Sequence, residues 1–201
     1  KQGASADNRR TYAVTMKYFL IFTLLAFLVV MAYIDILRYI VGRDYWEGLK
    51  TVPVVMIAEI FMGIYFNLSF WYKLTDRTIW GAWFSGAGCV VLLLCNVLFV
   101  PTYGYMACAW AGVAGYGTAM VLSYVVGQRY YPIDYPLGAM AKYSLLTAVL
   151  YGAMTLGQNA LPQTWMHLLL NTACVAFFLA YVVRTDMPLS GLPVVGKYFR
   201  K

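Results

Sequence analysis

Six runs of about 20 mostly apolar residues follow one another along the chain, separated by short polar segments, and this pattern limits the fold more than any other feature. A helix needs about 20 apolar residues to cross the hydrocarbon core of a bilayer. Of the 201 residues, 62% are hydrophobic and 11% are charged, whereas a soluble domain has about 25% charged residues. The sequence therefore predicts an all-α integral membrane protein with six transmembrane helices. The expected spans are residues 13–33, 51–72, 79–100, 104–126, 138–158 and 164–183.

The segments outside these spans give further expectations. Residues 1–12 are polar and begin with Lys rather than Met, so we expect a remnant of a cytoplasmic loop and a chain that is a fragment of a longer protein. Residues 35–50 mix charged, apolar and aromatic residues, which predicts a helix lying in the membrane interface. Residues 101–103, Pro-Thr-Tyr, are expected to form the turn of an antiparallel hairpin. Residues 184–201 are expected to form a basic cytoplasmic tail.

The positive charges predict the topology. The net charge of +7 lies between the apolar runs, which indicates membrane orientation and not a surface that binds nucleic acid. Cytoplasmic loops carry an excess of Lys and Arg, and 12 of the 15 basic residues fall on one side of the predicted membrane. Both termini are therefore expected in the cytoplasm. The twelve are Lys1, Arg9, Arg10, Lys17, Lys73, Arg77, Arg129, Lys142, Arg184, Lys197, Arg200 and Lys201.

A stripe of small residues runs along the fourth expected span. Its members recur at intervals of four residues, which places them on one side of a helix. In lipid, helices associate through dispersion contacts because the hydrophobic effect is absent there. Small side chains allow the close approach that these contacts need. We expect this small-residue stripe to be a packing surface. It consists of Ala107, Ala111, Gly115, Ala119 and Ser123.

Glu59 is the only acidic residue near the middle of an apolar run. A carboxylate at that depth must be protonated, paired or in contact with water. Asn67 lies eight residues later, which brings the two side chains within about 80° of each other around the helix. Two readings stay open: a proton- or cation-responsive group in a polar cavity that Asn67 also lines, or a neutral carboxylic acid bonded to a neighbouring helix.

Three basic residues are candidates for contact with an anionic ligand. Arg38 and Arg43 lie on the side opposite the termini and could meet an anionic substrate emerging there. The alternative is pairing with acidic residues of the same segment, Asp35, Asp44 and Glu47. Lys17, in the first turns of its span, either extends to the headgroups or contacts a lipid phosphate.

The sequence contains no recognisable catalytic arrangement. His167 is the only histidine, and we expect it to pack at the membrane interface. The amides of Asn96 and Asn171 are expected to bond between helices. The four cysteines lack the spacing of a zinc site. We therefore expect neither an enzyme nor a metal or cofactor.

Residues 45–136 carry a family resemblance. The segments are YWEGLKTVPVVMIAEIFMGIYFNLSFWYKLTDRT, GAWFSGAGCVVLLLCNVLFVPTYGYMACAWA and SYVVGQRYYPIDYP. They resemble the polysaccharide transporter branch of the multidrug/oligosaccharidyl-lipid/polysaccharide flippase superfamily. More narrowly, they are similar to the C-terminal part of lipopolysaccharide or O-antigen flippases from Bacteroidetes-type bacteria.

The resemblance implies a fold and a function. Such flippases have two pseudo-symmetric helical bundles around a central cavity, and they move a lipid-linked oligosaccharide across the bacterial inner membrane. This chain would form one lobe, with Glu59 and Asn67 near the inter-lobe cavity. Its partners would be membrane lipid, the lipid-linked oligosaccharide and the missing N-terminal lobe. A drug or cation exporter on the same fold, or a non-transporting scaffold or assembly subunit, remain alternatives.

Overall fold

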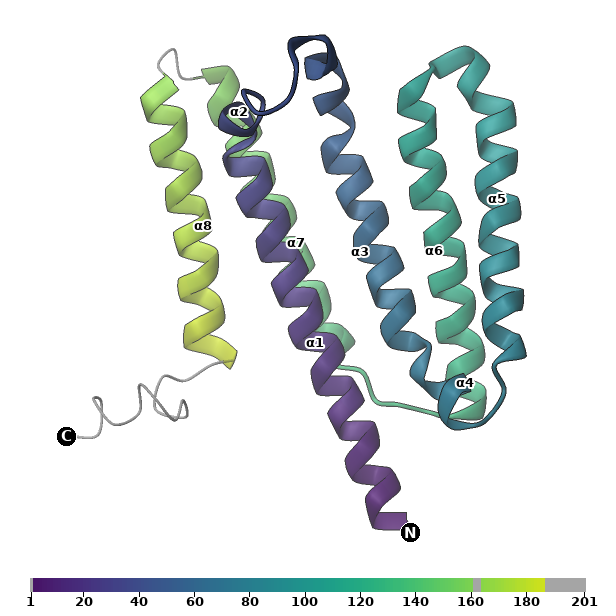
Figure 1. The fold of residues 1–201 in the computed structure, drawn as a ribbon. Helices are drawn as coiled ribbons and strands as arrows, with labels where there is room; N and C mark the ends of the chain where they lie inside the picture. Colours follow the sequence, from purple (N-terminus) through teal and green to yellow (C-terminus); the bar gives the residue numbers. More distant parts are fainter. Residues whose placement is uncertain (1, 161–163, 187–201) are drawn as a thin grey trace, which may run out of the picture. The chain divides into compact units, whose positions relative to one another are not determined.

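The chain is an all-α, multi-pass membrane protein, as the sequence predicts. The computed structural model describes residues 2–160 and 164–186, and these residues contain no strand. Six helical segments within them are long and apolar enough to cross a membrane (Figure 1). They are Asn8–Ala32, Arg43–Leu74, Ile79–Tyr103, Tyr105–Tyr130, Leu137–Gln158 and Trp165–Asp186.

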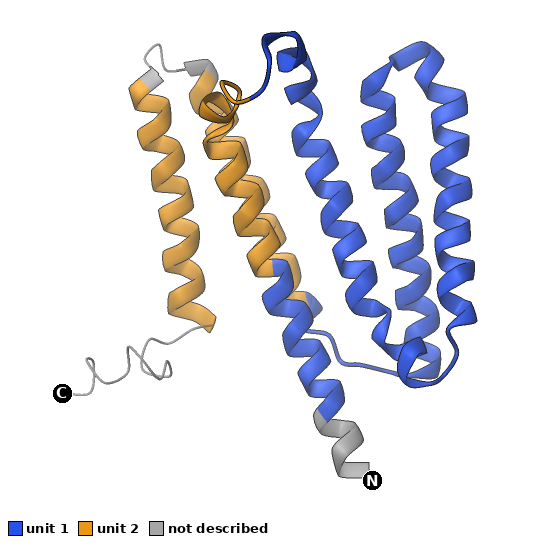
Figure 2. Cartoon of the chain, viewed as in Figure 1, with its two compact units in different colours: residues 1–20, 41–137 blue, residues 21–40, 138–201 orange. Residues whose placement is uncertain are grey.

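The helices fall into two compact units that share one helix (Figure 2). Unit 1 comprises residues 1–20 and 41–137, and unit 2 comprises residues 21–40 and 138–201. The first helix, α1, therefore belongs to both units. In chain order the helices are α1 (Gln2–Ala32), α2 (Ile34–Leu37), the 3-10 helix η1 (Arg43–Thr51), α3 (Val52–Leu68), α4 (Phe70–Leu74), α5 (Ile79–Tyr103), α6 (Tyr105–Tyr130), α7 (Leu137–Ala160) and α8 (Thr164–Asp186).

The N-terminal helix begins earlier than the sequence predicts. Residues 1–12 are expected to be a loop, but α1 is helical from Gln2. Hydropathy locates only the part of a helix that lies in lipid, whereas Ala and Arg favour a helix in any surroundings and no Pro interrupts this stretch. At the other end of the chain, α8 continues to Asp186, and the rest of the expected basic tail lies outside the described residues.

The expected interfacial helix over residues 35–50 is replaced by two short ones. α2 ends at Leu37, a turn follows, and η1 begins at Arg43 and leads directly into α3. A second interruption separates α3 from α4 at Ser69, whose hydroxyl donates to the carbonyl of Phe66 at 2.6 Å. Such bonds back to the preceding turn bend helices. The second span, Arg43–Leu74, therefore contains consecutive helices with an interruption at Ser69.

Gly104, rather than residues 101–103, turns the chain between α5 and α6. Pro101 lies inside the last turn of α5, which continues to Tyr103. Gly104 has φ +62° and ψ −147°, a conformation that essentially only glycine adopts. Its N–H donates to the carbonyl of Val100 at 2.8 Å. The expected Pro-Thr-Tyr turn is wrong because the backbone freedom of glycine, and not the constraint of proline, reverses the chain.

In unit 1, α6 lies between α3 and α5 and contacts both (Figure 1). A Cβ added to Gly88 of α5 would lie 2.7 Å from the carbonyl oxygen of Gly115, so the two helix backbones touch there. On the side facing α3, a Cβ added to Gly112 would lie 3.5 Å from Cβ of Ala58. All five residues of the small-residue stripe are buried. The small side chains of α6 thus allow neighbours to approach it on two sides.

An aromatic cluster joins α4, α5 and α6. Trp71 is almost fully buried and stacks on Tyr130, with ring centroids 5.8 Å apart and planes inclined by 9°. Trp80 stacks on Phe84 at 5.7 Å. The guanidinium of Arg77 lies over the Tyr130 ring, 4.7 Å from its centroid. A cation held over an aromatic face is favourable, so the cluster has a polar edge.

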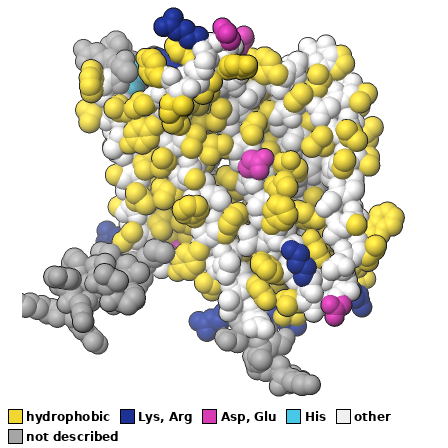
Figure 3. Space-filling view, in the orientation of Figure 1, with side chains coloured by type: hydrophobic (Ala, Val, Ile, Leu, Met, Phe, Trp, Pro, Cys, Tyr) yellow, Lys and Arg dark blue, Asp and Glu magenta, His cyan; other side chains and the backbone are white. Residues whose placement is uncertain are grey.

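Unit 2 has its own core between the later part of α1, α7 and α8. Leu28 and Phe178 are fully buried. Phe27 meets Tyr151 edge-on at 5.3 Å, and the hydroxyl of Tyr143 donates to the carboxylate of Asp186. In the space-filling view, hydrophobic side chains cover much of the drawn face and most Lys and Arg side chains lie towards the helix ends (Figure 3). This distribution suits a protein surrounded by lipid.

Candidate functional site

Unit 2 contains a cavity of about 600 Å³ where the end of α1, α2 and the beginning of α8 meet. Ligand pockets span about 300–1,000 Å³, so its size suits a small organic group. We call it the Asn171 cavity. Its polar and aromatic lining comes from Asp35, Arg38, Tyr39, Trp165, His167 and Asn171.

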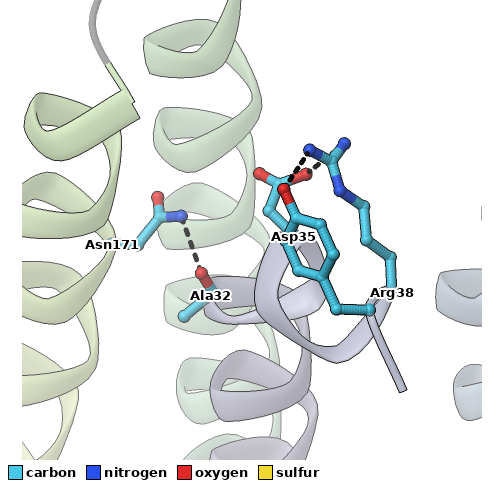
Figure 4. Close-up of polar contacts among 5 residues, drawn as sticks. Ala32, Asp35, Arg38 and Asn171 are labelled. Carbon is cyan, nitrogen blue, oxygen red and sulfur yellow. Dashed lines mark hydrogen bonds and ion pairs between the residues drawn. The ribbon is translucent and has the colours of Figure 1, made fainter. Parts of the chain in front are cut away.

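Asn171 ties α8 to α1 at this cavity (Figure 4). Its Nδ2 donates to the carbonyl of Ala32 at 3.0 Å, and the hydroxyls of Tyr33 and Thr172 lie 3.2 Å apart beside it. The last carbonyls of a helix lack partners within the helix, so this bond satisfies one at the end of α1. Asn171 is 2% exposed, and its Oδ1 has no hydrogen-bond partner within the described residues. The cavity therefore contains a buried acceptor.

Arg38 is held in place by two neighbours on its own segment. Its guanidinium lies 3.6 Å from Asp35 and donates to the hydroxyl of Tyr39 at 3.4 Å (Figure 4). The hydrogen bond to Tyr39, with a smaller contribution from Asp35, raises the pKa of Arg38 above its ordinary value. Pairing within the segment, the alternative considered from the sequence, is thus what the structure shows for Arg38.

Two aromatic side chains border the Asn171 cavity and remain largely exposed. Trp165 is 79% exposed and Tyr39 is 71% exposed. Aromatic faces beside amide, carboxylate and guanidinium groups can stack on an apolar face of a ligand while the polar groups bond to its hydroxyls. The arrangement suits a polyhydroxylated ligand such as a sugar. Within the described residues, no three His, Cys, Asp or Glu side chains are grouped to hold a metal ion.

Unit 1 contains a second cavity, of about 570 Å³, between the beginning of α1 and the linker that precedes α7. We call it the basic cavity. Burial, and to a smaller extent the nearby Tyr124, raise the pKa of Tyr135 in this linker to about 12. The charged and proline lining consists of Arg9, Arg10, Lys17, Pro132, Asp134 and Pro136.

Glu59 and Asn67 lie apart from both cavities. Glu59 is exposed near the middle of the candidate span Arg43–Leu74 and makes no hydrogen bond or ion pair within the described residues. Asn67 is half-buried and donates to the carbonyl of Gly63 in its own helix at 3.0 Å. About 12 Å of helix separates the two residues. The structure does not bring them into one cavity.

The remaining candidates are placed as follows. Arg43 is exposed at the start of η1 and lines neither cavity. Lys17 lines the basic cavity and His167 lines the Asn171 cavity. Asn171, expected to bond between helices, does so, whereas Asn96 bonds back to Leu92 within its own helix at 3.0 Å.

The sequence did not single out Trp165, Tyr39 or Asp134 as site residues. Trp165 follows Asp35 by 130 positions, so no local spacing could place them together. One signal was available: a tryptophan, a histidine and an asparagine fall within seven residues at the beginning of the last apolar run.

No family model matches the chain, and neither the curated proteins searched nor the solved structures searched contain a match. A functional conclusion therefore depends on the geometry of the described residues and on the resemblance drawn from the sequence. Fold alone does not identify function.

Proposed function

We propose that this chain is part of a membrane flippase that translocates a lipid-linked oligosaccharide across the bacterial inner membrane. It would act as one lobe, beside an N-terminal lobe, and would perform no covalent chemistry. The distribution of Lys and Arg supports cytoplasmic termini. The observation that carries the proposal is the exposed carboxyl group of Glu59 in the middle of a spanning segment.

The position of Glu59 indicates that its side of α3 does not face lipid alone. A charged side chain at the bilayer centre costs about 2.5–3.5 kcal/mol or more, and such groups face a bundle interior or a water-filled cavity. Its neighbour Ala58 is buried against Gly112 of α6, whereas Glu59 is exposed. The exposed side of α3 is therefore suited to border a polar pathway, which is what a transporter requires.

The Asn171 cavity supports a glycan as the cargo. Its buried acceptor, Asn171 Oδ1, can accept a hydrogen bond from a hydroxyl group, and the carboxylate of Asp35 can accept another. The exposed rings of Trp165 and Tyr39 offer stacking surfaces. The resemblance of residues 45–136 to polysaccharide transporters points to the same class of cargo.

Replacement of Glu59 tests the proposal in cells that export a surface polysaccharide through the full-length protein. We expect Glu59→Gln to reduce export per molecule of protein, because the amide cannot carry the charge or exchange the proton of the carboxyl group. Glu59→Asp should restore part of the export. Glu47→Gln, at an exposed position in η1, is the matched control and should leave export unchanged.

Each alternative function predicts a different result. Unchanged export together with altered sensitivity to organic cations would favour a drug or cation exporter. A change in protein abundance with unchanged export per molecule would favour a scaffold or assembly subunit. Equal export by Glu59→Gln and the control at equal abundance would contradict the proposed role of Glu59.

A further inference from the structure

The basic cavity gathers positive charge at one end of α1. Arg9 and Lys17 are eight residues apart on α1, and Ala13 lies midway between them. Arg10 follows Arg9 directly, and all four residues line the cavity. Residues four apart on a helix are neighbours on one face. One face of α1 and the linker segment that covers it therefore enclose the cavity.

The covering segment is held in a fixed conformation. Pro132 and Pro136 restrict the backbone on either side of Ile133, which is 3% exposed. The carbonyl of Ile133 accepts a hydrogen bond from Nε2 of Gln128 at 2.8 Å and another from the amide of Tyr135 at 3.0 Å. The linker thus forms a wall of the cavity that is fixed in position before any ligand binds.

Basic side chains outnumber carboxylates among the residues that line the cavity. Three basic side chains face one carboxylate, that of Asp134, which is exposed and takes part in no ion pair within residues 2–160 and 164–186. The guanidinium of Arg9 lies 4.4 Å from the centroid of the Tyr131 ring. Its Nε is buried and has no hydrogen-bond partner among the described residues. The cavity has donors and positive charge available for an anion.

Arg9 and Arg10 of the basic cavity lie at the beginning of a candidate membrane span. The candidate span begins at Asn8 and contains 25 residues, about 37 Å of helix, which is longer than the hydrocarbon core of about 30 Å. At least one end of this span therefore extends beyond the hydrocarbon core, and Arg9 and Arg10 lie at one of its two ends. Basic pockets between spanning helices on the cytoplasmic side bind anionic headgroups.

We propose that the basic cavity, with Arg9, Arg10 and Lys17 as its cationic residues, binds the phosphate group of an anionic phospholipid of the surrounding bilayer. The phosphate bonds to the guanidinium groups of Arg9 and Arg10, whose planar N–H groups match phosphate oxygens. Lys17, which lies further along the candidate span than Arg9 and Arg10, contributes its positive charge. This site is separate from the proposed translocation of a glycan and stands without it.

Lipid binding to the full chain in detergent tests the site. Native mass spectrometry would measure the affinity for phosphatidylglycerol, with phosphatidylcholine as the zwitterionic lipid. A basic residue near an anionic headgroup contributes about 1 kcal/mol, so removing three should weaken binding about a hundredfold. The variant is Arg9→Gln, Arg10→Gln and Lys17→Gln together. We expect phosphatidylglycerol to bind more tightly than phosphatidylcholine, and only this variant to lose the difference.

A control with the same loss of charge isolates the cavity. Lys73→Gln, Arg129→Gln and Arg184→Gln together remove three exposed positive charges from elsewhere in the chain. This control should keep its preference for phosphatidylglycerol. If the triple cavity variant fails to fold, the single variant Arg10→Glu, at an exposed position, should weaken phosphatidylglycerol binding on its own.

Three results would overturn the proposal. The first is equal affinity for phosphatidylglycerol and phosphatidylcholine in the unmodified chain. The second is an equal loss of binding in the cavity variants and in the control. The third is binding of inorganic phosphate as tight as that of phosphatidylglycerol, which would assign the cavity to free phosphate instead of a lipid.

Discussion

Gly88 of α5 and Gly115 of α6 lie so close that a methyl group on either would meet the carbonyl oxygen of the other, at 2.7 and 2.8 Å respectively. Real Cβ atoms essentially never approach a carbonyl oxygen so closely. The contact lies between two backbones, which cannot move aside as a flexible side chain could. The separation of these two helices is therefore set by the absence of two side chains.

We expect Gly115→Ala to destabilise the protein by about 1–3 kcal/mol, because the added methyl forces α5 and α6 apart. Gly86→Ala is the control, since a Cβ at Gly86 meets nothing within 4 Å. That change should leave stability unchanged or raise it by up to about 1 kcal/mol, because Ala favours a helix more than Gly does. Unfolding in mixed detergent micelles, followed by circular dichroism, measures both. Equal stability of the two variants would contradict the close contact.

The turn at Gly104 gives a second prediction. A residue with a side chain in this conformation is strained by about 1–3 kcal/mol, so Gly104→Ala should lower the free energy of unfolding by that amount. Open space surrounds Gly104, so any loss must come from the backbone and not from a clash. Gly48→Ala, also in open space but without a positive φ, should have little effect. The same unfolding measurement compares them.

Replacement of the two asparagines Asn171 and Asn96 should lower the stability of the protein by different amounts. Asn171→Leu leaves the carbonyl of Ala32 without its donor and should destabilise the protein by about 1–3 kcal/mol. Asn96→Leu removes a bond to a carbonyl in its own helix and should change stability by about 0.5 kcal/mol or less. Thermal unfolding of both variants in one detergent distinguishes these cases. A larger cost at Asn96 than at Asn171 would be inconsistent with the bond between α8 and α1.

The surroundings of Glu59 can be examined directly with a thiol. In a background without the native Cys89, Cys95, Cys108 and Cys174, Glu59→Cys should react with a membrane-impermeant maleimide. Val90→Cys, exposed near the middle of α5, should not react, because the reactive thiolate does not form in lipid. Mass spectrometry of the labelled chain in vesicles measures both. Similarly slow labelling at the two positions would place Glu59 against lipid.

The spans could be predicted from the sequence because apolar length is a property of each segment alone. The ends of the helices could not. Hydropathy does not distinguish a polar helix from a polar loop before Ala13, and it does not register the single hydroxyl of Ser69 that interrupts the second span. At the hairpin, the proline was the stronger local signal, but the glycine three residues later determines the turn.

The candidate sites were predictable only in part. From the sequence, Lys17 was expected either to extend to the headgroups or to contact a lipid phosphate, and the structure places it in the lining of the basic cavity. Pro132 and Pro136, which help to enclose that cavity, follow Lys17 by more than 100 residues, so only the fold brings them together. For Asn67, the helical projection was misleading. It places Asn67 on the same side of the helix as Glu59, but the Asn67 side chain donates its hydrogen bond to the nearby carbonyl of Gly63.

α1 runs unbroken through the point where the chain passes from unit 1 to unit 2, between Leu20 and Ile21. The other two passages lie in a turn after Ile40 and at the first residue of α7. Sharp kinks require Pro, Gly or a local insertion, and residues 11–32 contain neither Pro nor Gly. Neither unit is therefore encoded by one continuous stretch of the chain, and a deletion of α1 would remove part of both.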